Sequence, residues 1–363
     1  MAIDDLPLRD DLRGQRPYGA PQLDVAVRLN TNENPYSPDD AVVASIVDRV
    51  TDAARGLNRY PDRDAVELRH ALAGYISERT GASTAFEQVW PANGSNEVLQ
   101  QILQAFGGAG RSALGFEPTY AMHRLISRGT ATAYLTAERG TRFELTAELV
   151  AAAVAAHDPD VVFLCSPNNP TGTPLGVDVI SAAHDASRGV VVVDEAYGEF
   201  NSRPSAVRLL AGRERLVVVR TLSKALELAG ARLGYAVAAR SVVDALQLVR
   251  LPYHLSAMTQ AVGLAALEHT ASLMQGVEAL KVQRDRMAVA LSELGYDVYP
   301  SEANFVFFGG MQDQTALWRE LLEASVLVRD VGIAGHLRVT SGTPEETETF
   351  LEAIRTITKE LAS

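Results

Sequence analysis

The fold is decided by residues 217–237, which read VVVRTLSKALELAGARLGYAV. The stretch opens with a β-branched run that predicts a buried strand, and Lys224 follows shortly after it. Burying a lone ammonium group is costly, so a buried lysine loses its proton or gains a partner. Two interpretations of Lys224 are open at this point. It is either an ordinary lysine that opens a surface helix or an amine nucleophile that forms a Schiff base with a carbonyl cofactor.

Apolar runs alternate with segments of helical periodicity over much of the preceding chain. The periodicity predicts helices at 40–54 and at 64–79, the second with Asp64 as its N-cap. Continuous apolar strands that alternate with helices are typical of a largely parallel sheet covered on both faces. The sequence therefore predicts an α/β fold, with strands at 89–92, 112–115, 131–135, 161–165, 190–193 and 217–219.

Polar residues stand at the carboxyl ends of these strands, the edge beyond which such sheets bind their ligands. After the first strand, Gly94 permits a tight turn, and Ser95 and Asn96 stand where a helix N-cap belongs. The free N–H groups of that helix end make an anion site. No dinucleotide glycine pattern is present, so we expect a cup for one phosphate. The other strand ends carry Asn169, Asp194, Tyr197, Thr221 and Lys224.

If Lys224 forms a Schiff base, the natural cofactor is pyridoxal 5′-phosphate, and its phosphate has candidate ligands. Such a phosphate binds helix N–H groups, hydroxyls and an arginine. The Gly94–Asn96 turn, Ser223 and Arg232 can supply all three.

The pyridine ring of this cofactor also has candidate partners. Its protonated nitrogen needs an anion, and Asp194 at a strand end is suitable. Its phenolate oxygen needs donors, which Asn169 and the Tyr197 hydroxyl can provide, and its face can stack on Tyr120. Each residue alone has an ordinary structural explanation as a turn, cap or core residue. Their combination favours the cofactor.

The chain divides near residues 250–260, where Pro252 interrupts a helical stretch. A long helix over 261–294 is expected next, followed by short strands at 296–299, 304–308, 326–329 and 337–340 and a final helix over 344–361. This pattern predicts a smaller α+β domain at 259–363. Residues 1–30, rich in prolines and charges, predict an extended arm, which leaves 31–258 as the large cofactor-binding domain.

Composition excludes several classes of function. The chain has 363 residues and a formal charge of -12, which argues against a nucleic-acid partner. Its single cysteine, Cys165, lies in an apolar run and offers neither a disulfide nor a metal-binding cluster. No apolar segment reaches the length of a membrane span, and the N-terminus lacks a signal-peptide core, so we expect a soluble cytoplasmic protein without a metal site.

The motifs together resemble fold-type I aminotransferases of class I/II, which depend on pyridoxal 5′-phosphate. The resemblance covers nearly the whole chain and rests on Asn169-Pro170-Thr171-Gly172, Asp194-Glu195-Ala196-Tyr197 and Ser223-Lys224 with Arg232. It implies a large domain with a mostly parallel seven-stranded sheet between helices, a smaller C-terminal domain and an N-terminal arm. More narrowly, the chain is similar to actinobacterial histidinol-phosphate aminotransferases in LNTNENP (29–35), RYPD (59–62), ANGSNE (92–97), VLVRD (326–330) and LRVTSGT (337–343).

The resemblance implies roles for individual residues. Lys224 would bind the cofactor and then act as general acid and base. Arg338 would clamp the anionic group of the substrate, and Arg329 would assist with a phosphate. Tyr60 would reach the cofactor phosphate of a neighbouring subunit, which implies a homodimer with shared active sites. Further substrate-binding candidates are Tyr18, Asn34, Tyr60, Asn96, Tyr120 and Tyr253.

The implied reaction transfers an amino group from L-histidinol phosphate to 2-oxoglutarate, giving imidazole-acetol phosphate and glutamate, a step of histidine biosynthesis. Tyrosine walls suit an imidazole but also a larger aromatic ring, so an aromatic amino-acid aminotransferase is the alternative. A threonine-phosphate decarboxylase would share the cofactor residues, and a non-catalytic α/β binding protein would share only the fold.

Overall fold

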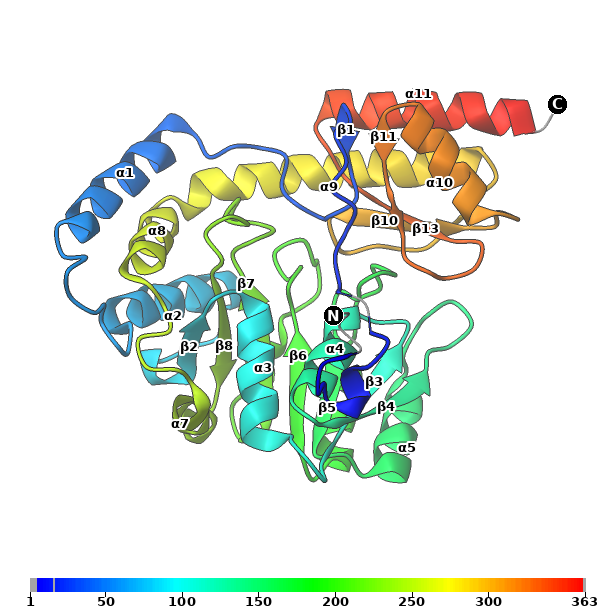
Figure 1. Ribbon diagram of the computed structural model, residues 1–363. Helices are drawn as coiled ribbons and strands as arrows, with labels where there is room; N and C mark the ends of the chain where they lie inside the picture. The colour runs from blue at the N-terminus through cyan, green and yellow to red at the C-terminus, as the bar shows by residue number, and fades with distance from the viewer. Residues whose placement is uncertain (1–4, 16, 362–363) are drawn as a thin grey trace.

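A seven-stranded sheet forms the centre of the larger part of the molecule in the computed structural model (Figure 1). The structure describes residues 5–15 and 17–361, so residues 1–4 and 16 of the predicted arm lie outside the described residues. The strand order is β2-β8-β7-β6-β5-β3-β4. Every strand runs in the same direction except β8, which pairs antiparallel with both β2 and β7. The bounds are β2 Val89–Ala92, β3 Ser112–Glu117, β4 Ala133–Glu138, β5 Val161–Cys165, β6 Val190–Asp194, β7 Leu216–Thr221 and β8 Gly234–Ala238.

Both faces of this sheet are buried, as its valine-rich strands require. Successive residues of β6 point to opposite faces: Val190 and Val192 belong to one apolar core, and Val191 and Val193 to the other. The first core is covered by α3 (Ser95–Phe106), α4 (Ala121–Gly129) and α7 (Arg240–Val249). The second core is covered by α2 (Val66–Thr80), α5 (Ala147–His157), α6 (Val177–Ala186) and α8 (Ala257–Glu268). The predicted mostly parallel, seven-stranded α/β fold is confirmed.

The C-terminal part contains a second, four-stranded antiparallel sheet of order β12-β13-β10-β9. Its strands are β9 Asp297–Val298, β10 Phe305–Gly309, β12 Arg329–Asp330 and β13 Leu337–Thr340. Residues of α9 (Thr270–Glu293), α10 (Gln314–Glu323) and α11 (Pro344–Leu361) surround a third apolar core against it. The end of the N-terminal arm joins this part, because β1 (Val27–Arg28) pairs in parallel with β11 (Val326–Leu327).

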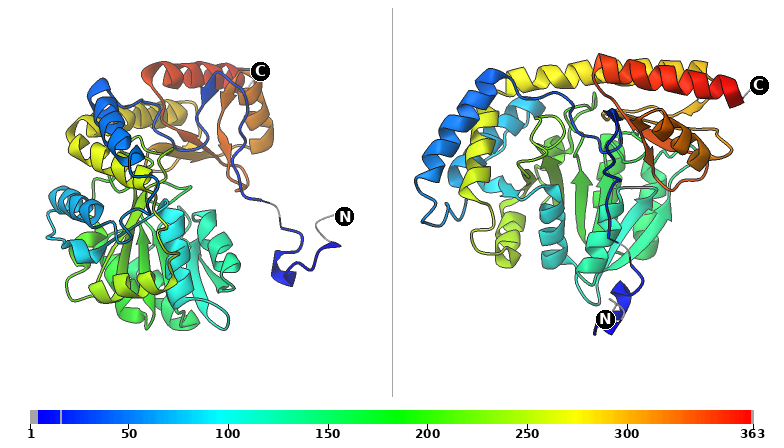
Figure 2. Two further views of the ribbon diagram at one scale, coloured as in Figure 1. Left: turned by 60° about the vertical axis from the view of Figure 1, so that its left-hand side comes forward. Right: turned by 45° about the horizontal axis from the view of Figure 1, so that its top comes forward.

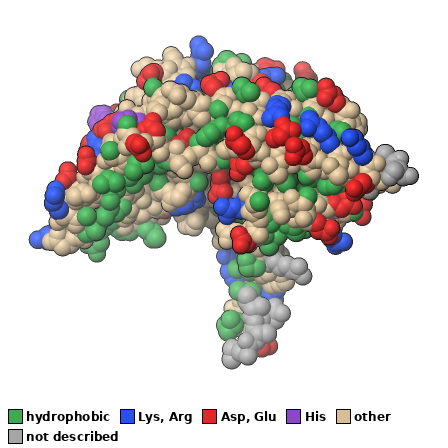
Figure 3. Space-filling view, turned by 90° about the horizontal axis from the view of Figure 1, so that it is seen from above, with side chains coloured by type: hydrophobic (Ala, Val, Ile, Leu, Met, Phe, Trp, Pro, Cys, Tyr) green, Lys and Arg blue, Asp and Glu red, His purple; other side chains and the backbone are tan. Residues whose placement is uncertain are grey.

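The rest of the arm extends along the large part and projects from the body (Figures 2 and 3). In the described part of the arm, a short 3-10 turn spans Asp10–Leu12. Arg9 ties it to the C-terminus of α4 by donating to the carbonyl oxygens of Arg128 and Gly129 at 3.0 and 3.3 Å. Two further 3-10 turns span Phe86–Gln88 and Ala206–Leu209, and α1 spans Asp40–Ala54.

Two local predictions are wrong, and one of the two interpretations left open for Lys224 is excluded. The helix expected over 261–294 is two helices, because His269 leaves the helical region at φ -116° and ψ 23°. Asp64 does not cap α2: its N-cap is Ala65, and the Asp64 carboxylate instead accepts bonds from Arg63 and Arg250. Lys224 does not open a helix, since the loop 222–233 connects β7 directly to β8.

The core packing suggests where the domains divide. Helix α8 packs against α1 and α2, which places residues 259–268 with the large part. Along α9, Leu273 and Val277 belong to the large core and Met287 and Leu291 to the small one. We therefore propose a division within α9 rather than at residue 258, with β1 of the arm counted in the small domain.

In the part of the chain that the structure describes, no helix is long and apolar enough to cross a membrane. Within the same residues, no group of three or more His, Cys, Asp or Glu side chains could bind a metal ion.

Candidate active site

A cavity of about 220 Å³ lies beyond the carboxyl ends of the parallel strands. Its walls come from the arm and the segment after β1, the turns after β2, β3, β5, β6 and β7, and the small sheet. Residues far apart in the sequence therefore meet there, as the edge of a parallel sheet allows. The lining residues are Tyr18, Ala20, Asn30, Thr31, Asn32, Ser95, Asn96, Tyr120, Cys165, Asn169, Asp194, Ala196, Tyr197, Thr221, Ser223, Lys224, Arg232, Arg329 and Arg338.

The amine of Lys224 lies in this cavity on the loop between β7 and β8. Its Nζ donates a hydrogen bond of 3.2 Å to the carbonyl oxygen of Thr31, and it forms no ion pair with any described residue. Burial, followed by the positive charge of Arg338, lowers the pKa of Lys224 from 10.5 to about 8. Nearly half of the side chains are thus neutral amines at pH 8, which is the state a nucleophile needs.

The N-terminus of α3 forms a cup for an anion. Its N-cap is Gly94, so no side chain accepts from the first N–H groups of the helix. Gly94 has φ +81°, and a Cβ there would lie 2.8 Å from a terminal guanidinium nitrogen of Arg232. Glycine therefore lets Arg232 approach the helix end closely. Thr221 and Ser223, whose hydroxyls are hydrogen-bonded to each other at 3.0 Å, also line the cavity.

Asp194 lies buried at the end of β6 with one partner that the sequence did not indicate. The Nε2 of His123 lies 3.1 Å from Asp194 Oδ2, and the His123 ring stacks on Phe163 with centroids 4.7 Å apart. The other carboxylate oxygen accepts from the backbone N–H of Ala196 at 3.2 Å. Since His123 stands three residues after Tyr120 on α4, helical spacing could have indicated that both face the same site.

The Tyr197 hydroxyl is held by two amides. It accepts from Asn32 Nδ2 at 2.8 Å and from Asn169 Nδ2 at 3.4 Å, so its own proton is available to a ligand. Burial raises the pKa of Tyr197, which keeps the hydroxyl protonated. Across the cavity, the Tyr120 hydroxyl donates to Asn96 Oδ1 at 3.2 Å.

Two arginines from the small sheet complete the walls. Arg329 on β12 and Arg338 on β13 are cross-strand partners in register. Like charges directly opposite each other are unfavourable without a counterion. Neither arginine forms an ion pair among the described residues, and Nε of Arg338 is buried without a partner. Burial and the charge of Arg329 lower the pKa of Arg338. The pair is therefore suited to bind an anion.

The structure brings together most of the predicted site residues in the cavity, but four do not line it: Gly94, Tyr60, Tyr253 and Asn34. Gly94 adjoins the cavity through Arg232, although it does not line it. Tyr60 is 79% exposed and stacks on Tyr253, with centroids 4.4 Å apart, outside the cavity of the single subunit. Asn34 faces Gly276 of α9 instead of the cavity.

Several wall residues were not predicted. The segment 29–35 is dense in turn-forming residues, and we selected Asn34 from it, but Asn30, Thr31 and Asn32 line the cavity. Asn32 has φ +58°, a conformation that asparagine adopts more readily than most residues. Cys165, expected in the core, is 2% exposed and also lines the cavity.

The class of the protein follows from these elements together with a family comparison. A model of class I and II aminotransferases matches residues 25–354. The chain belongs to this family, whose members depend on pyridoxal 5′-phosphate.

Its relatives narrow the class. A histidinol-phosphate aminotransferase of Paenarthrobacter aurescens (strain TC1) is 56% identical over 360 residues, which cover 98% of this chain and 96% of that protein. A histidinol-phosphate aminotransferase of Corynebacterium glutamicum (strain R) is 53% identical over 360 residues, which cover 99% of this chain and 98% of that protein.

Solved structures share the fold. Histidinol-phosphate aminotransferase from Sinorhizobium meliloti, in complex with pyridoxal-5′-phosphate, superposes with a TM-score of 0.82 at 23% identity and covers 93% of this chain and 92% of that one. Aspartate aminotransferase from Thermotoga maritima superposes with a TM-score of 0.80 at 21% identity and covers 94% of this chain and 92% of that one. Proteins with different names are thus similar in fold, so the fold does not fix the substrate.

The cavity fits the family's cofactor on observations of this structure. The uncapped end of α3 with Arg232 suits a phosphate, and the buried Asp194 suits a protonated ring nitrogen. The amine of Lys224, which forms no ion pair with a described residue, suits the aldehyde. The cavity therefore contains a suitable group for the phosphate, the ring nitrogen and the aldehyde of the cofactor.

Proposed function

We propose that this protein transfers the amino group of L-histidinol phosphate to 2-oxoglutarate, yielding imidazole-acetol phosphate and glutamate, in histidine biosynthesis. The identity of 50–56% to histidinol-phosphate aminotransferases over nearly the whole chain supports the proposal. One structural observation carries it: a buried amine, Lys224, lines the same cavity as Arg329 and Arg338, neither of which forms an ion pair with a described residue.

Lys224 is the proposed catalytic residue. When bound, pyridoxal 5′-phosphate supplies an electron sink for the pair left on carbon when the substrate loses its Cα proton. The neutral Nζ of Lys224 accepts that proton and returns it to the cofactor side, so one side chain acts as base and then as acid. Its pKa of about 8 lies close to the pH at which such transfers are efficient.

Other wall residues bind and orient. We assign Asp194 to the ring nitrogen, Asn169 and Tyr197 to the phenolate oxygen, and Tyr120 to the ring face. The phosphate is assigned to Gly94, Ser95, Asn96, Thr221, Ser223 and Arg232.

Arg329 and Arg338 are the proposed anion clamp for both substrates. Histidinol phosphate carries a phosphate where glutamate carries a carboxylate, and a guanidinium fork accepts either. Tyr18, Tyr120 and Asn96 are assigned to the imidazole end. Because Tyr18 belongs to the arm, the arm would form one wall of the substrate site.

We further propose a homodimer in which Tyr60, with Tyr253 beside it, acts in the neighbouring subunit's site. Exposed apolar side chains supply surface for such a contact: Val43 and Val47 of α1 and Leu57 are 45%, 55% and 56% exposed, and Leu251 is 74% exposed. In Figure 3, hydrophobic side chains gather at the left side of the molecule, where α1 lies. Exposed apolar surface of this kind is typical of a protein interface. Asn34 stays a proposed substrate-binding residue, although its side chain would have to move toward the cavity to contact a substrate. The proposed location of the protein is the cytoplasm.

Half-reaction kinetics test the substrate. Purified holoenzyme is mixed with histidinol phosphate or with phenylalanine in the absence of a keto acid, and loss of the visible cofactor band is followed. We expect the specificity constant for histidinol phosphate to be at least a hundredfold higher. Equal or reversed values would support the aromatic aminotransferase instead. In a separate reaction with threonine phosphate, carbon dioxide release without keto product would support a decarboxylase. A protein without a visible band after addition of pyridoxal phosphate would contradict the enzyme proposal.

A further inference from the structure

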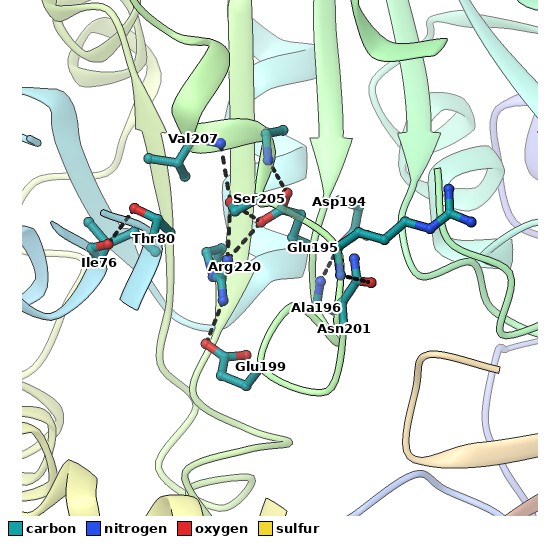
Figure 4. Close-up of polar contacts among 12 residues, drawn as sticks. Ile76, Thr80, Asp194, Glu195, Ala196, Glu199, Asn201, Ser205, Val207 and Arg220 are labelled. Atoms are coloured by element: carbon teal, nitrogen blue, oxygen red, sulfur yellow. Dashed lines mark hydrogen bonds and ion pairs between the residues drawn. The ribbon is translucent and has the colours of Figure 1, made fainter. Parts of the chain in front are cut away.

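A buried group of charges, drawn in Figure 4, includes neighbours in sequence of the cavity residues Asp194 and Thr221 but does not itself line the cavity. At its centre is Arg220 of β7, the residue before the cavity residue Thr221, with 2% of its surface exposed. Nη1 of Arg220 donates to Glu195 Oε2 at 2.6 Å, and Nη2 donates to Glu199 Oε1 at 2.7 Å. We name Glu195, Glu199 and Arg220 the buried triad.

The two carboxylates of the buried triad enclose a turn that carries one proposed cofactor residue, Tyr197, and that directly follows another, Asp194. Glu195 is the residue after Asp194, and Glu199 comes two residues after Tyr197. One guanidinium group therefore holds the turn on both sides of Tyr197 and, through Glu195, at the residue next to Asp194. Displacement of either carboxylate would move the backbone next to Asp194 or Tyr197.

The carboxylates are themselves fixed by other elements. Glu195 Oε1 accepts from the backbone N–H of Ala206 at 2.6 Å, and its Oε2 accepts from Ser205 Oγ at 2.7 Å. Glu199 Oε1 accepts from the Tyr75 hydroxyl of α2 at 3.0 Å. Although burial lowers the pKa of Arg220, the charges of Glu199 and Glu195 raise it well above its ordinary value, so the guanidinium stays charged.

The planar shape of the guanidinium is required at this position. A Cβ on Gly198 would lie 2.7 Å from Nη2 of Arg220 and 2.8 Å from both Cζ and Nη1. The guanidinium thus packs against the Cα of Gly198 while its two ends reach different carboxylates. A lysine ammonium is a single point charge and cannot bridge both in this geometry.

Stability alone does not account for the buried triad. Two carboxylates and one guanidinium leave one net negative charge, and buried ion pairs often contribute no more than apolar residues of similar volume. We propose that Arg220 is a positioning residue that, through Glu195 and Glu199, fixes the turn presenting Asp194 and Tyr197 to the cofactor. The proposal rests on the proposed function for the identity of that cofactor.

Two variants test this from different directions. Arg220→Lys removes the fork, and Gly198→Ala keeps the arginine but displaces it. The matched controls are Arg69→Lys, another buried arginine, whose Nε donates to the carbonyl oxygen of Val89 away from the cavity, and Gly74→Ala, an open position on α2. For each protein we would measure Tm, the dissociation constant of pyridoxal 5′-phosphate from the cofactor-free protein, and the pH midpoint of the visible band.

We expect both test variants to bind pyridoxal 5′-phosphate about tenfold to a hundredfold more weakly, as happens when groups that orient a site are lost. Their kcat should fall by about a hundredfold with less change in KM, and the pH midpoint should shift. Arg69→Lys should keep wild-type affinity and midpoint even if it lowers Tm by a similar amount, and Gly74→Ala should keep both without a loss in Tm, because alanine favours a helix more than glycine does. Wild-type affinity and midpoint in either folded test variant would overturn the proposal. If Arg220→Lys does not fold, the cofactor affinity and pH midpoint of Gly198→Ala alone test the proposal.

Cofactor binding also separates this inference from the proposed function. It is measured without any amino-acid substrate, so a wild-type protein inactive toward histidinol phosphate would contradict the proposed function only. The comparison of variants in cofactor affinity would still be valid.

Discussion

Arg338 donates a hydrogen bond of 2.6 Å from Nη1 to Asn169 Oδ1, which joins a proposed substrate clamp to a proposed cofactor ligand. The second amino group, Nη2, donates to the carbonyl oxygen of Asn30 at 2.8 Å. The guanidinium plane is therefore fixed before any substrate binds, and Nε is the nitrogen left without a partner. A fixed fork of this kind binds an anion at low entropic cost.

Replacing Arg338 with lysine should lower kcat/KM for both histidinol phosphate and glutamate. A lysine cannot keep the bonds to Asn169 and Asn30 while also gripping an anion. Charge-assisted hydrogen bonds of about 1.5–3 kcal/mol correspond to a loss of about tenfold to a hundredfold. Steady-state kinetics would measure the loss, with Arg319→Lys at an exposed position of α10 as control. Unchanged kcat/KM for both substrates would rule out the clamp.

Arg329 offers a separate test of the same clamp, because it lies opposite Arg338 and its side chain forms no hydrogen bond with the described residues. Arg329→Met should raise KM for histidinol phosphate more than KM for glutamate, since a phosphate dianion gains more from the second positive charge. The ratio of the two KM values is the measurement. An equal change for both substrates would show that Arg329 does not distinguish them.

Sequence patterns predicted the helices and strands whose formation depends on residues close together in the sequence. The valines of β6 are buried on both faces, so a continuous apolar run identified the strand. The last strand of the large sheet, β8, was not located, because its sequence GYAVA is short, begins with glycine and follows a loop rather than a helix. The break at His269 contains neither proline nor glycine, so the helical periodicity of the sequence continues through it and one helix was predicted instead of two.

The site was predictable where one residue type suits one chemical group. Asp194 at the end of β6 and Lys224 in the loop after β7 were identified by their position at strand ends, and Arg232 in the same loop was identified as the arginine that a phosphate needs. Asn32 and His123 act through Tyr197 and Asp194, respectively, and such contacts between distant segments leave no local pattern. Asn32 is 165 residues from its partner Tyr197.

The pKa of Lys224 gives a prediction on stability. Because burial and the charge of Arg338 lower the pKa of Lys224 to about 8 in the folded protein, the unfolded chain binds the extra proton between pH 8 and 10.5. Folding stability of the cofactor-free protein should therefore rise with pH across this window, and below pH 8 the full penalty remains. A pKa shift of this size corresponds to about 3 kcal/mol in the free energy of unfolding.

Lys224→Met removes that penalty. The cofactor-free variant should be more stable than the wild type by up to about 3 kcal/mol below pH 8, and the difference should decline toward pH 10.5. Urea unfolding of both proteins at several pH values measures it. Lys359→Met, at an exposed position near the end of α11, is the control and should show no such trend. A variant that is less stable than the wild type below pH 8 would mean that Lys224 is not buried as a strained charge.

The proposed dimer makes a prediction that depends on which subunit supplies Tyr60. Tyr60 is exposed and lies outside the cavity of its own subunit. If it acts in the neighbouring site, a mixed dimer of Lys224→Ala and Tyr60→Ala subunits has one site with both defects. The other site has Lys224 from one chain and Tyr60 from its partner, and is intact.

Each variant alone should therefore have little activity. Mixing them after reversible dissociation should restore up to one active site per mixed dimer, or about a quarter of wild-type activity for random pairing of equal amounts. Activity is measured as a function of the mixing ratio, and the wild type treated in the same way corrects for losses. A Lys224→Ala subunit mixed with a Lys224→Ala, Tyr60→Ala subunit is the matched control and should stay inactive. If mixing restores nothing while mixed dimers form, Tyr60 acts within its own subunit or has no role in the site, and the proposal of shared active sites is wrong.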